Sequence, residues 1–130
     1  MMTTAHAVIA SGILTLLMLL VGSAFCAKAW TPPGMDIAFG NRENVAPAIG
    51  MAGRADRAAY NMLEGMLLLL AAVLAAQISG KLPQAALGAT VFFWARLVYW
   101  PVYLAGIIYL RTAVWFVSII GIGMIVVEAW

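Results

Sequence analysis

Four long apolar stretches run through the chain, and short polar stretches separate them. They cover Ala7 to Ala27, about Ala52 to Ile78, Gln84 to about Leu110, and about Thr112 to Ala129. A helix of about 20 residues crosses a hydrocarbon layer that is about 30 Å thick, and each stretch provides that length. The pattern therefore predicts an all-α integral membrane protein, built as a bundle of four transmembrane helices.

Composition agrees with this fold and narrows the function. The chain is 65% hydrophobic and 9% charged, whereas soluble domains carry about 25% charged residues. No stretch remains for a second, soluble domain, so we expect one domain over residues 1–130. The net charge of +2 is small and its basic residues are dispersed, which argues against nucleic acid as a partner. The single cysteine, Cys26, excludes an intramolecular disulfide, and the sequence has no cluster of metal ligands.

The first apolar stretch has an alternative interpretation as a secretory signal peptide, since Gly22-Ser23-Ala24 resembles a cleavage region. A signal peptide begins with a positively charged segment, but no Lys or Arg precedes Lys28. We therefore expect an uncleaved span. Five basic residues are expected on one side of the membrane, and Lys81 is expected on the other side. The five are Lys28, Arg42, Arg54, Arg57 and Arg111. The positive-inside rule places both termini on the non-cytoplasmic side.

Glycine and proline are frequent from Trp30 to Gly53, and this density predicts a loop rather than a helix. Loops longer than about 12–15 residues usually have a function. This one would either cover the polar face of the second span as a lid or lie along the lipid headgroups, with Trp30 as an interfacial anchor. We expect a tight turn over Ser79 to Pro83, and a third span that Pro101 bends without ending it.

Polar residues form one row on the second span. Arg54, Arg57, Asn61 and Glu64 are spaced three, four and three apart, which places them on one helix face. On the third span, Arg96, Tyr99 and Tyr103 share a face, and Arg111 follows at its end. At about 1.5 Å per residue, both Glu64 and Arg96 come near the middle of the membrane. Opposite charges at one depth on neighbouring spans are expected to pair.

These residues also have plain structural interpretations. The Glu64–Arg96 pair could simply fix helix packing, and the tyrosines and remaining basic residues could be interfacial anchors. However, five of the seven basic residues are expected toward one end of the bundle. They are Lys28, Arg54, Arg57, Arg96 and Arg111. With Asn61, Glu64 and two tyrosines, they predict a donor-rich site for a small anion that carries carboxylates and an ammonium group.

Two motifs resemble the MAPEG family, the membrane-associated proteins in eicosanoid and glutathione metabolism. They are Arg57-Ala-x-x-Asn61-x-x-Glu64 and Ala95-Arg96-x-x-Tyr99-x-x-x-Tyr103-Leu-x-Gly106, followed by an arginine near the start of the fourth span. The family includes microsomal glutathione transferases and the prostaglandin E and leukotriene C synthases. The resemblance implies a bacterial-type member of the inner membrane. It also implies a left-handed four-helix bundle in a homotrimer, with glutathione as cosubstrate between subunits.

The resemblance also implies roles for single residues. Arg57, Asn61 and Glu64 would hold the tripeptide, with Glu64 on its amino group and Arg57 on a carboxylate. Tyr99 and Arg111 would be the catalytic residues, with Arg111 facing the thiol. The cofactor-binding set is completed by residues at both ends of the site: Lys28, Arg54, Arg96 and Tyr103. Gly65-Met66 stands where the eicosanoid members carry aromatics or proline, which argues against an eicosanoid substrate.

Two functions follow from the resemblance. The first is a glutathione-dependent transferase or peroxidase that acts on lipophilic electrophiles from the bilayer. The alternative is a non-catalytic accessory subunit that keeps the scaffold and packs against a larger membrane complex. A transporter is disfavoured, because four spans without an internal repeat leave little room for alternating access.

Overall fold

The computed structural model of the chain is a bundle of four long helices, and it describes residues 1–43 and 45–130. The long helices are α1 (Thr4–Ala27), α3 (Gly50–Ile78), α4 (Ala86–Ala105) and α5 (Ile108–Ala129). A short helix α2 (Pro32–Phe39) follows α1, and a 3-10 turn η1 (Leu82–Ala85) leads into α4. All four long helices are long and apolar enough to cross a membrane. The predicted all-α, four-span fold is confirmed.

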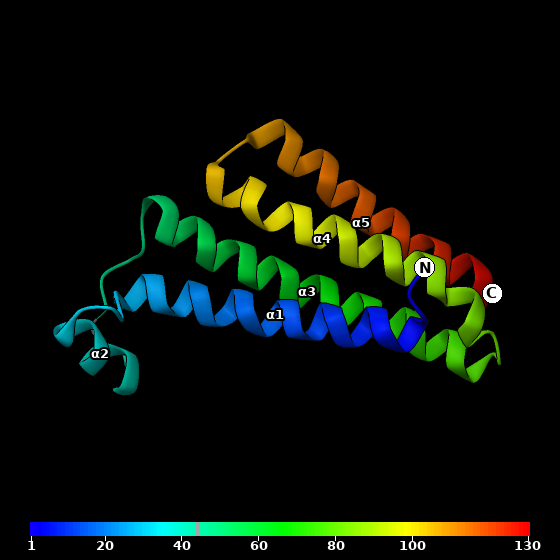
Figure 1. Ribbon diagram of the computed structural model, residues 1–130, viewed down its shortest axis with the longest axis horizontal. Helices are drawn as coiled ribbons and strands as arrows, with labels where there is room; N and C mark the ends of the chain where they lie inside the picture. Colours follow the sequence, from blue (N-terminus) through cyan, green and yellow to red (C-terminus); the bar gives the residue numbers. More distant parts are fainter. Residues whose placement is uncertain (44) are drawn as a thin grey trace.

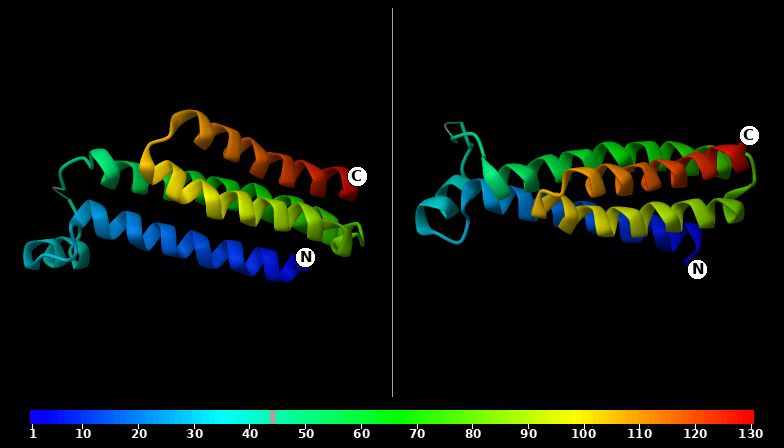
Figure 2. Two further views of the ribbon diagram at one scale, coloured as in Figure 1. Left: turned by 45° about the horizontal axis from the view of Figure 1, so that its top comes forward. Right: turned by 90° about the horizontal axis from the view of Figure 1, so that it is seen from above.

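The four spans form a closed arrangement in which neighbours are not always consecutive. α1 contacts α3 and α4, and α5 contacts α3 and α4, whereas α1 and α5 make no contact in the described residues. Figure 1 shows α1 beside α3 and α4 beside α5, with both chain termini at one end of the bundle. The turned views show the same arrangement (Figure 2). The shared end agrees with an even number of spans, while the side of the membrane that it faces stays a prediction.

The surface of the bundle is as apolar as its interior. Many large apolar side chains are exposed on all four spans, among them Leu20, Leu67, Leu74, Val98 and Val127. The interior instead holds mostly alanine and methionine, with a few larger residues such as Leu69 and Phe92. A soluble protein rarely exposes contiguous apolar surface of this extent. The outer surface therefore fits a lipid bilayer.

Two glycines bring α4 and α5 into close contact. A Cβ on Gly121 would lie 2.7 Å from the carbonyl oxygen of Gly88 and 2.9 Å from the amide nitrogen of Phe92. A Cβ on Gly88 would likewise collide with the carbonyl oxygen of Gly121. Small residues at such positions let helix backbones approach inside a membrane. This contact sets the distance between α4 and α5.

The connection from Trp30 to Gly53 was predicted as a loop, and this prediction is wrong at both ends. Helix α2 forms at Pro32–Phe39, and α3 already begins at Gly50. The hydroxyl of Thr31 accepts a hydrogen bond from the amide of Gly34 at 3.1 Å, and the two prolines occupy the first helical positions. Proline is favoured there because those amide groups have no partner within the helix. Residue 44 of this connection lies outside the described residues.

Helix α2 is not a lid over the polar row. Among the helices it contacts α1 alone, and Figures 1 and 2 show it beyond the end of α1. The guanidinium of Arg42 ties it there, since Nη2 donates to the carbonyl of Ala38 at 3.0 Å and Nη1 donates to the hydroxyl of Ser23 at 2.5 Å. Helix α2 therefore does not cover the polar face of the second span in this single chain, which was one of the two roles predicted for the connection.

The boundary between the last two spans lies earlier than predicted. Helix α4 ends at Ala105, because Gly106 takes a left-handed conformation with φ 78° that a side-chain-bearing residue rarely adopts. Helix α5 begins at Ile108. Pro101 stays inside α4, as expected. Arg111 consequently falls in the first turn of α5 rather than in the connecting turn.

The glycine contact gives a direct test of this packing. We expect Gly121→Ala to lower the stability of the bundle by about 1–3 kcal/mol, because the new methyl group must push two helix backbones apart. Gly123→Ala is the matched control, since a Cβ there meets nothing within 4 Å. Thermal unfolding in detergent measures both variants. Equal melting temperatures for the two would contradict the close contact.

Candidate functional site

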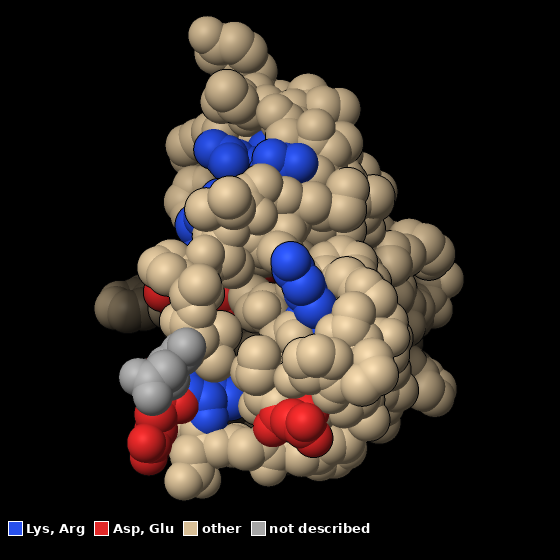
Figure 3. Space-filling view, turned by 90° about the vertical axis from the view of Figure 1, so that its left-hand side faces the viewer, with Lys and Arg blue, Asp and Glu red and all other residues tan. Residues whose placement is uncertain are grey.

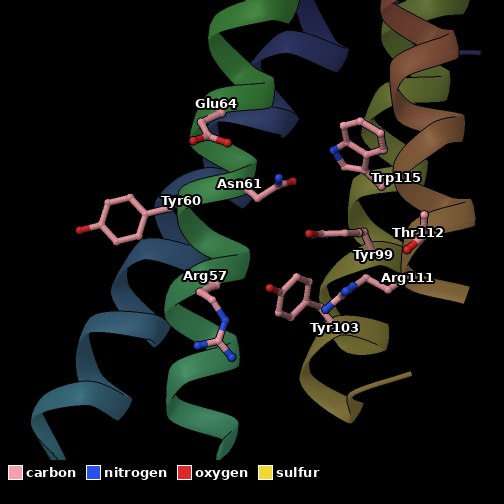
Figure 4. Close-up of a pocket in the computed structure, with 9 residues that line it drawn as sticks. All are labelled: Arg57, Tyr60, Asn61, Glu64, Tyr99, Tyr103, Arg111, Thr112 and Trp115. Carbon is pink, nitrogen blue, oxygen red and sulfur yellow. The ribbon is translucent and has the colours of Figure 1, made fainter. Parts of the chain in front are cut away.

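A cleft of about 380 Å³ opens between α3, α4 and α5, and polar side chains from all three helices line it. Six of its nine lining residues were predicted from the sequence, and Figure 4 shows how they lie on the three helices. The lining residues are Arg57, Tyr60, Asn61, Glu64, Tyr99, Tyr103, Arg111, Thr112 and Trp115. The structure thus brings the two predicted motifs and Arg111 to one place.

Helix α3 forms one wall of the cleft, and the cleft is open to the surroundings along the exposed side of this helix. Asn61 extends from α3 toward α4, whereas Tyr60 points away from it (Figure 4). Tyr60 is 58% exposed, and Arg57 and Glu64 are exposed as well. At about 1.5 Å per residue, Glu64 lies roughly 21 Å along α3 from Gly50. Charged groups at that depth are costly beside lipid, so this side of the cleft requires a cover.

Aromatic contacts position the opposite wall. The rings of Tyr99 and Tyr103 meet edge to face with their centroids 5.3 Å apart. The guanidinium carbon of Arg111 lies 4.7 Å from the centroid of the Tyr103 ring, an attractive cation–π distance. Both tyrosine hydroxyls point from α4 toward α3 (Figure 4). A ligand in the cleft would therefore meet two hydroxyls and a cation on this wall.

Arg96 lies behind the cleft, and its partner differs from the predicted one. Its side chain is buried, with 1% of its surface exposed, and Nη1 donates to Oδ1 of Asn61 at 2.6 Å. Within residues 1–43 and 45–130, no hydrogen bond or ion pair joins Arg96 to Glu64. The direct pair does not form, because the Glu64 side chain turns to the open side of the cleft (Figure 4) although the guanidinium lies beside its neighbour Gly65.

Besides Arg96, two further predicted site residues do not line the cleft. Nε of Arg54 donates to the carbonyl of Leu104 at 2.9 Å, so this arginine satisfies a free carbonyl at the end of α4. Lys28 ends α1 in a left-handed conformation with φ 52° and is exposed. Arg54 therefore joins α3 to α4, and Lys28 belongs to the end surface of the bundle. Figure 3 shows that end, where basic side chains are spread over several places.

Sequence reasoning missed three lining residues, Tyr60, Thr112 and Trp115. Trp115 follows Arg111 by four positions and Thr112 by three, so it is a neighbour of both on the surface of α5. The fourth span was expected to begin at Thr112, which left Arg111 outside the helix and hid this relation. Tyr60 follows Arg57 by three positions and precedes Glu64 by four, so the same helical spacing could have identified it.

The cleft combines features that suit a zwitterionic ligand with excess negative charge. Arg57, Arg111 and the adjoining Arg96 contribute three guanidinium groups, and Glu64 contributes one carboxylate. The tyrosine hydroxyls and the amide of Asn61 add neutral hydrogen-bonding groups, and Trp115 adds an apolar surface. In the described part of the chain, no group of His, Cys, Asp and Glu side chains could hold a metal ion.

The family model of MAPEG matches residues 3–130, which is nearly the whole chain. The chain belongs to the MAPEG family. Members of this family include glutathione transferases and related proteins. No curated protein and no solved structure matches this MAPEG protein. The roles of its residues must therefore be argued from its own geometry.

Two arginines one turn apart on α3 should respond differently to mutation. We expect Arg54→Met to lower the melting temperature, because the carbonyl of Leu104 loses a charge-assisted hydrogen bond that contributes about 1 kcal/mol. Arg57→Met should leave it unchanged or raise it slightly, since Arg57 adds positive charge to a cleft already rich in arginine. Thermal unfolding in detergent compares the two. A larger loss for Arg57→Met would contradict this assignment.

Proposed function

We propose that this MAPEG protein is a glutathione-dependent membrane transferase or peroxidase that acts on lipophilic electrophiles. The observation that carries the proposal is the cleft, which Arg57, Asn61 and Glu64 line from α3 and the two tyrosines and Arg111 line from α4 and α5. Family membership supports the same chemistry. The cleft volume of about 380 Å³ falls within the usual range of small-molecule sites, about 300–1,000 Å³.

The charges of glutathione match those of the cleft. Glutathione carries two carboxylates and one ammonium group at neutral pH, and ionisation of its thiol adds a second net negative charge. Arg57 suits a carboxylate, since its planar guanidinium can donate two parallel hydrogen bonds. Glu64 suits the ammonium group. Three guanidinium groups against one carboxylate leave a net charge of +2 at the site, which favours the thiolate form of the ligand.

Arg111 is the residue that we assign to the thiolate. It lies in the first turn of α5, where the helix macrodipole adds a positive potential to that of the side chain. A cation close to a thiol favours the charged form and lowers its pKa from about 8.5. In the reaction the sulfur forms a bond to the electrophilic carbon, and the displaced electron pair leaves with a leaving group. The Tyr99 hydroxyl is placed to donate a hydrogen bond to the developing charge.

The open side of the cleft supports a homotrimer. Glu64 and Tyr60 are exposed on α3 at membrane depth, and a carboxylate in contact with lipid tails is unfavourable. A neighbouring copy that covers this side would shield Glu64 and complete the walls around the ligand. Lipophilic substrates would then reach the sulfur from the bilayer. The cytoplasmic position of this end of the bundle follows from the positive-inside rule.

Substitution of Arg111 tests the proposed chemistry. We expect the wild type to bind glutathione and to show thiolate absorbance at pH 7. In Arg111→Ala the thiol pKa should rise by about 1–3 units, so the conjugation rate at pH 7 should fall about tenfold to a thousandfold. The rate should recover as the pH approaches the raised pKa, because the thiolate returns there. Spectra and rates between pH 6 and 9 measure both effects.

Arg111→Lys is the matched control, since it keeps a cation at the same position. Its titration should remain closer to that of the wild type than the titration of Arg111→Ala does. If Arg111→Ala leaves the thiol titration unmoved, Arg111 is only an interfacial anchor. If the wild type binds no glutathione, the transferase proposal fails and the accessory-subunit alternative gains.

The proposed trimer has its own test. Native mass spectrometry of the protein released from detergent should show three copies of the 13.9 kDa chain. Glu64→Leu should weaken this assembly, because the monomer then no longer exposes that carboxylate to lipid. A spectrum that contains only monomers would contradict the proposal, and a one-to-one assembly with another protein would favour an accessory subunit.

A further inference from the structure

We propose that Arg96 is a positioning residue that fixes the side-chain amide of Asn61 as a hydrogen-bond donor toward the cleft. Asn61 would then bind an oxygen atom of the ligand, a carboxylate or carbonyl, and not its ammonium group. The identity of this ligand as glutathione rests on the proposed function. The orientation of the Asn61 amide does not depend on the proposed function, because it follows from the hydrogen bond to Arg96.

The orientation follows from what arginine can do. A guanidinium group has donors and no acceptor, so the atom of Asn61 that meets Arg96 must be its carbonyl oxygen. The distance from Nη1 to Oδ1 is 2.6 Å, as short as strong charge-assisted hydrogen bonds are. A free asparagine can present either its oxygen or its nitrogen to a ligand. With its oxygen turned to Arg96, the amide presents its other end, the two N–H groups, away from Arg96.

The surroundings of Arg96 keep it in this place. Its guanidinium carbon lies 5.3 Å from the ring centroid of Phe92 and 5.2 Å from that of Tyr99. Helix α3 passes at Gly65, where a Cβ would lie 2.5 Å from Nη2 of Arg96. The buried Nε of Arg96 has no partner among the described residues. Loss of the bond to Asn61 would strand a second buried donor, which is unfavourable.

This arrangement selects which group of a zwitterionic ligand lies against α4. Glutathione carries both carboxylates and an ammonium group, and each would meet a different end of an asparagine amide. Asn61 lines the cleft and extends toward α4 (Figure 4), while Glu64 lies on the open side. The structure therefore assigns the ammonium group to the side of Glu64 and an oxygen-bearing group to the side of Asn61.

Substitution of Asn61 by aspartate distinguishes a donor from an acceptor. Aspartate has the same shape and can still bond Arg96, but it has no N–H group to offer. We expect Asn61→Asp to weaken glutathione binding at least as much as Asn61→Ala does, about tenfold to a hundredfold. If the amide oxygen instead accepted from the ammonium group, Asn61→Asp would bind glutathione as well as the wild type or better. That result would overturn the proposal.

A spectroscopic measurement tests the role of Arg96 without any ligand. The chain has three asparagines, so labelling with ¹⁵N-asparagine gives few side-chain amide signals, and the Asn61 signal is the one lost in Asn61→Asp. Arg96→Met should shift this signal. Gly65→Ala should shift it too, because its methyl group displaces the guanidinium, whereas Gly123→Ala, which meets nothing within 4 Å, should not.

The two experiments separate the two proposals. Wild-type protein that binds no glutathione contradicts the proposed function, while the amide signal still decides whether Arg96 holds Asn61. Conversely, a signal that neither Arg96→Met nor Gly65→Ala moves ends the positioning role, even where glutathione binds. Arg96→Lys is a further check, since a lysine that reaches Asn61 should return the signal partly toward its wild-type position.

Discussion

Charge inside a membrane is the constraint on which the rest of this structure depends. A guanidinium in hydrocarbon is costly unless it finds partners, and Arg96 is almost fully buried in the bundle. Its surroundings are built accordingly, with Asn61 as an acceptor, two aromatic rings beside it and Gly65 leaving room for it. Because Arg96 lies between α3 and α4, these contacts also set how the two helices meet. The cleft begins where this buried cluster ends.

The remaining polar groups follow the same constraint in two ways. Arg54 turns to the free carbonyl of Leu104 and closes the end of α4 against α3. Arg57, Glu64 and Arg111 gather in one cleft, and the short connection between α4 and α5 brings Arg111 to the ring of Tyr103. At this cleft, the exposed charged residues Arg57 and Glu64 both lie on α3. A ligand inside the cleft would neutralise these charges, and a second subunit over the cleft would shield them from lipid.

The sequence predicts the spans and the polar rows because both depend on local period. Arg57, Asn61 and Glu64 recur at helical spacing, so their common face could be derived without a structure. The partner of Arg96 could not be derived from the sequence in this way, since Asn61 and Glu64 lie one turn apart and only the packing of the side chains decides between them. Helix α2 was missed because prolines that stop a helix interior also start a helix. Thr112 and Trp115 were missed because the left-handed Gly106 begins α5 earlier than hydropathy suggests.

The central claim is that this cleft binds glutathione through its charges. Equilibrium dialysis of radiolabelled glutathione against the protein in lipid nanodiscs tests it most directly. The account predicts saturable binding of the labelled glutathione, and this binding should weaken as the salt concentration rises, since salt screens the charges involved. An S-alkyl glutathione should displace the label. The dimethyl ester of glutathione, which lacks both carboxylate charges, should not compete. Absence of saturable binding at millimolar concentrations, or equal competition by the ester, would contradict the account.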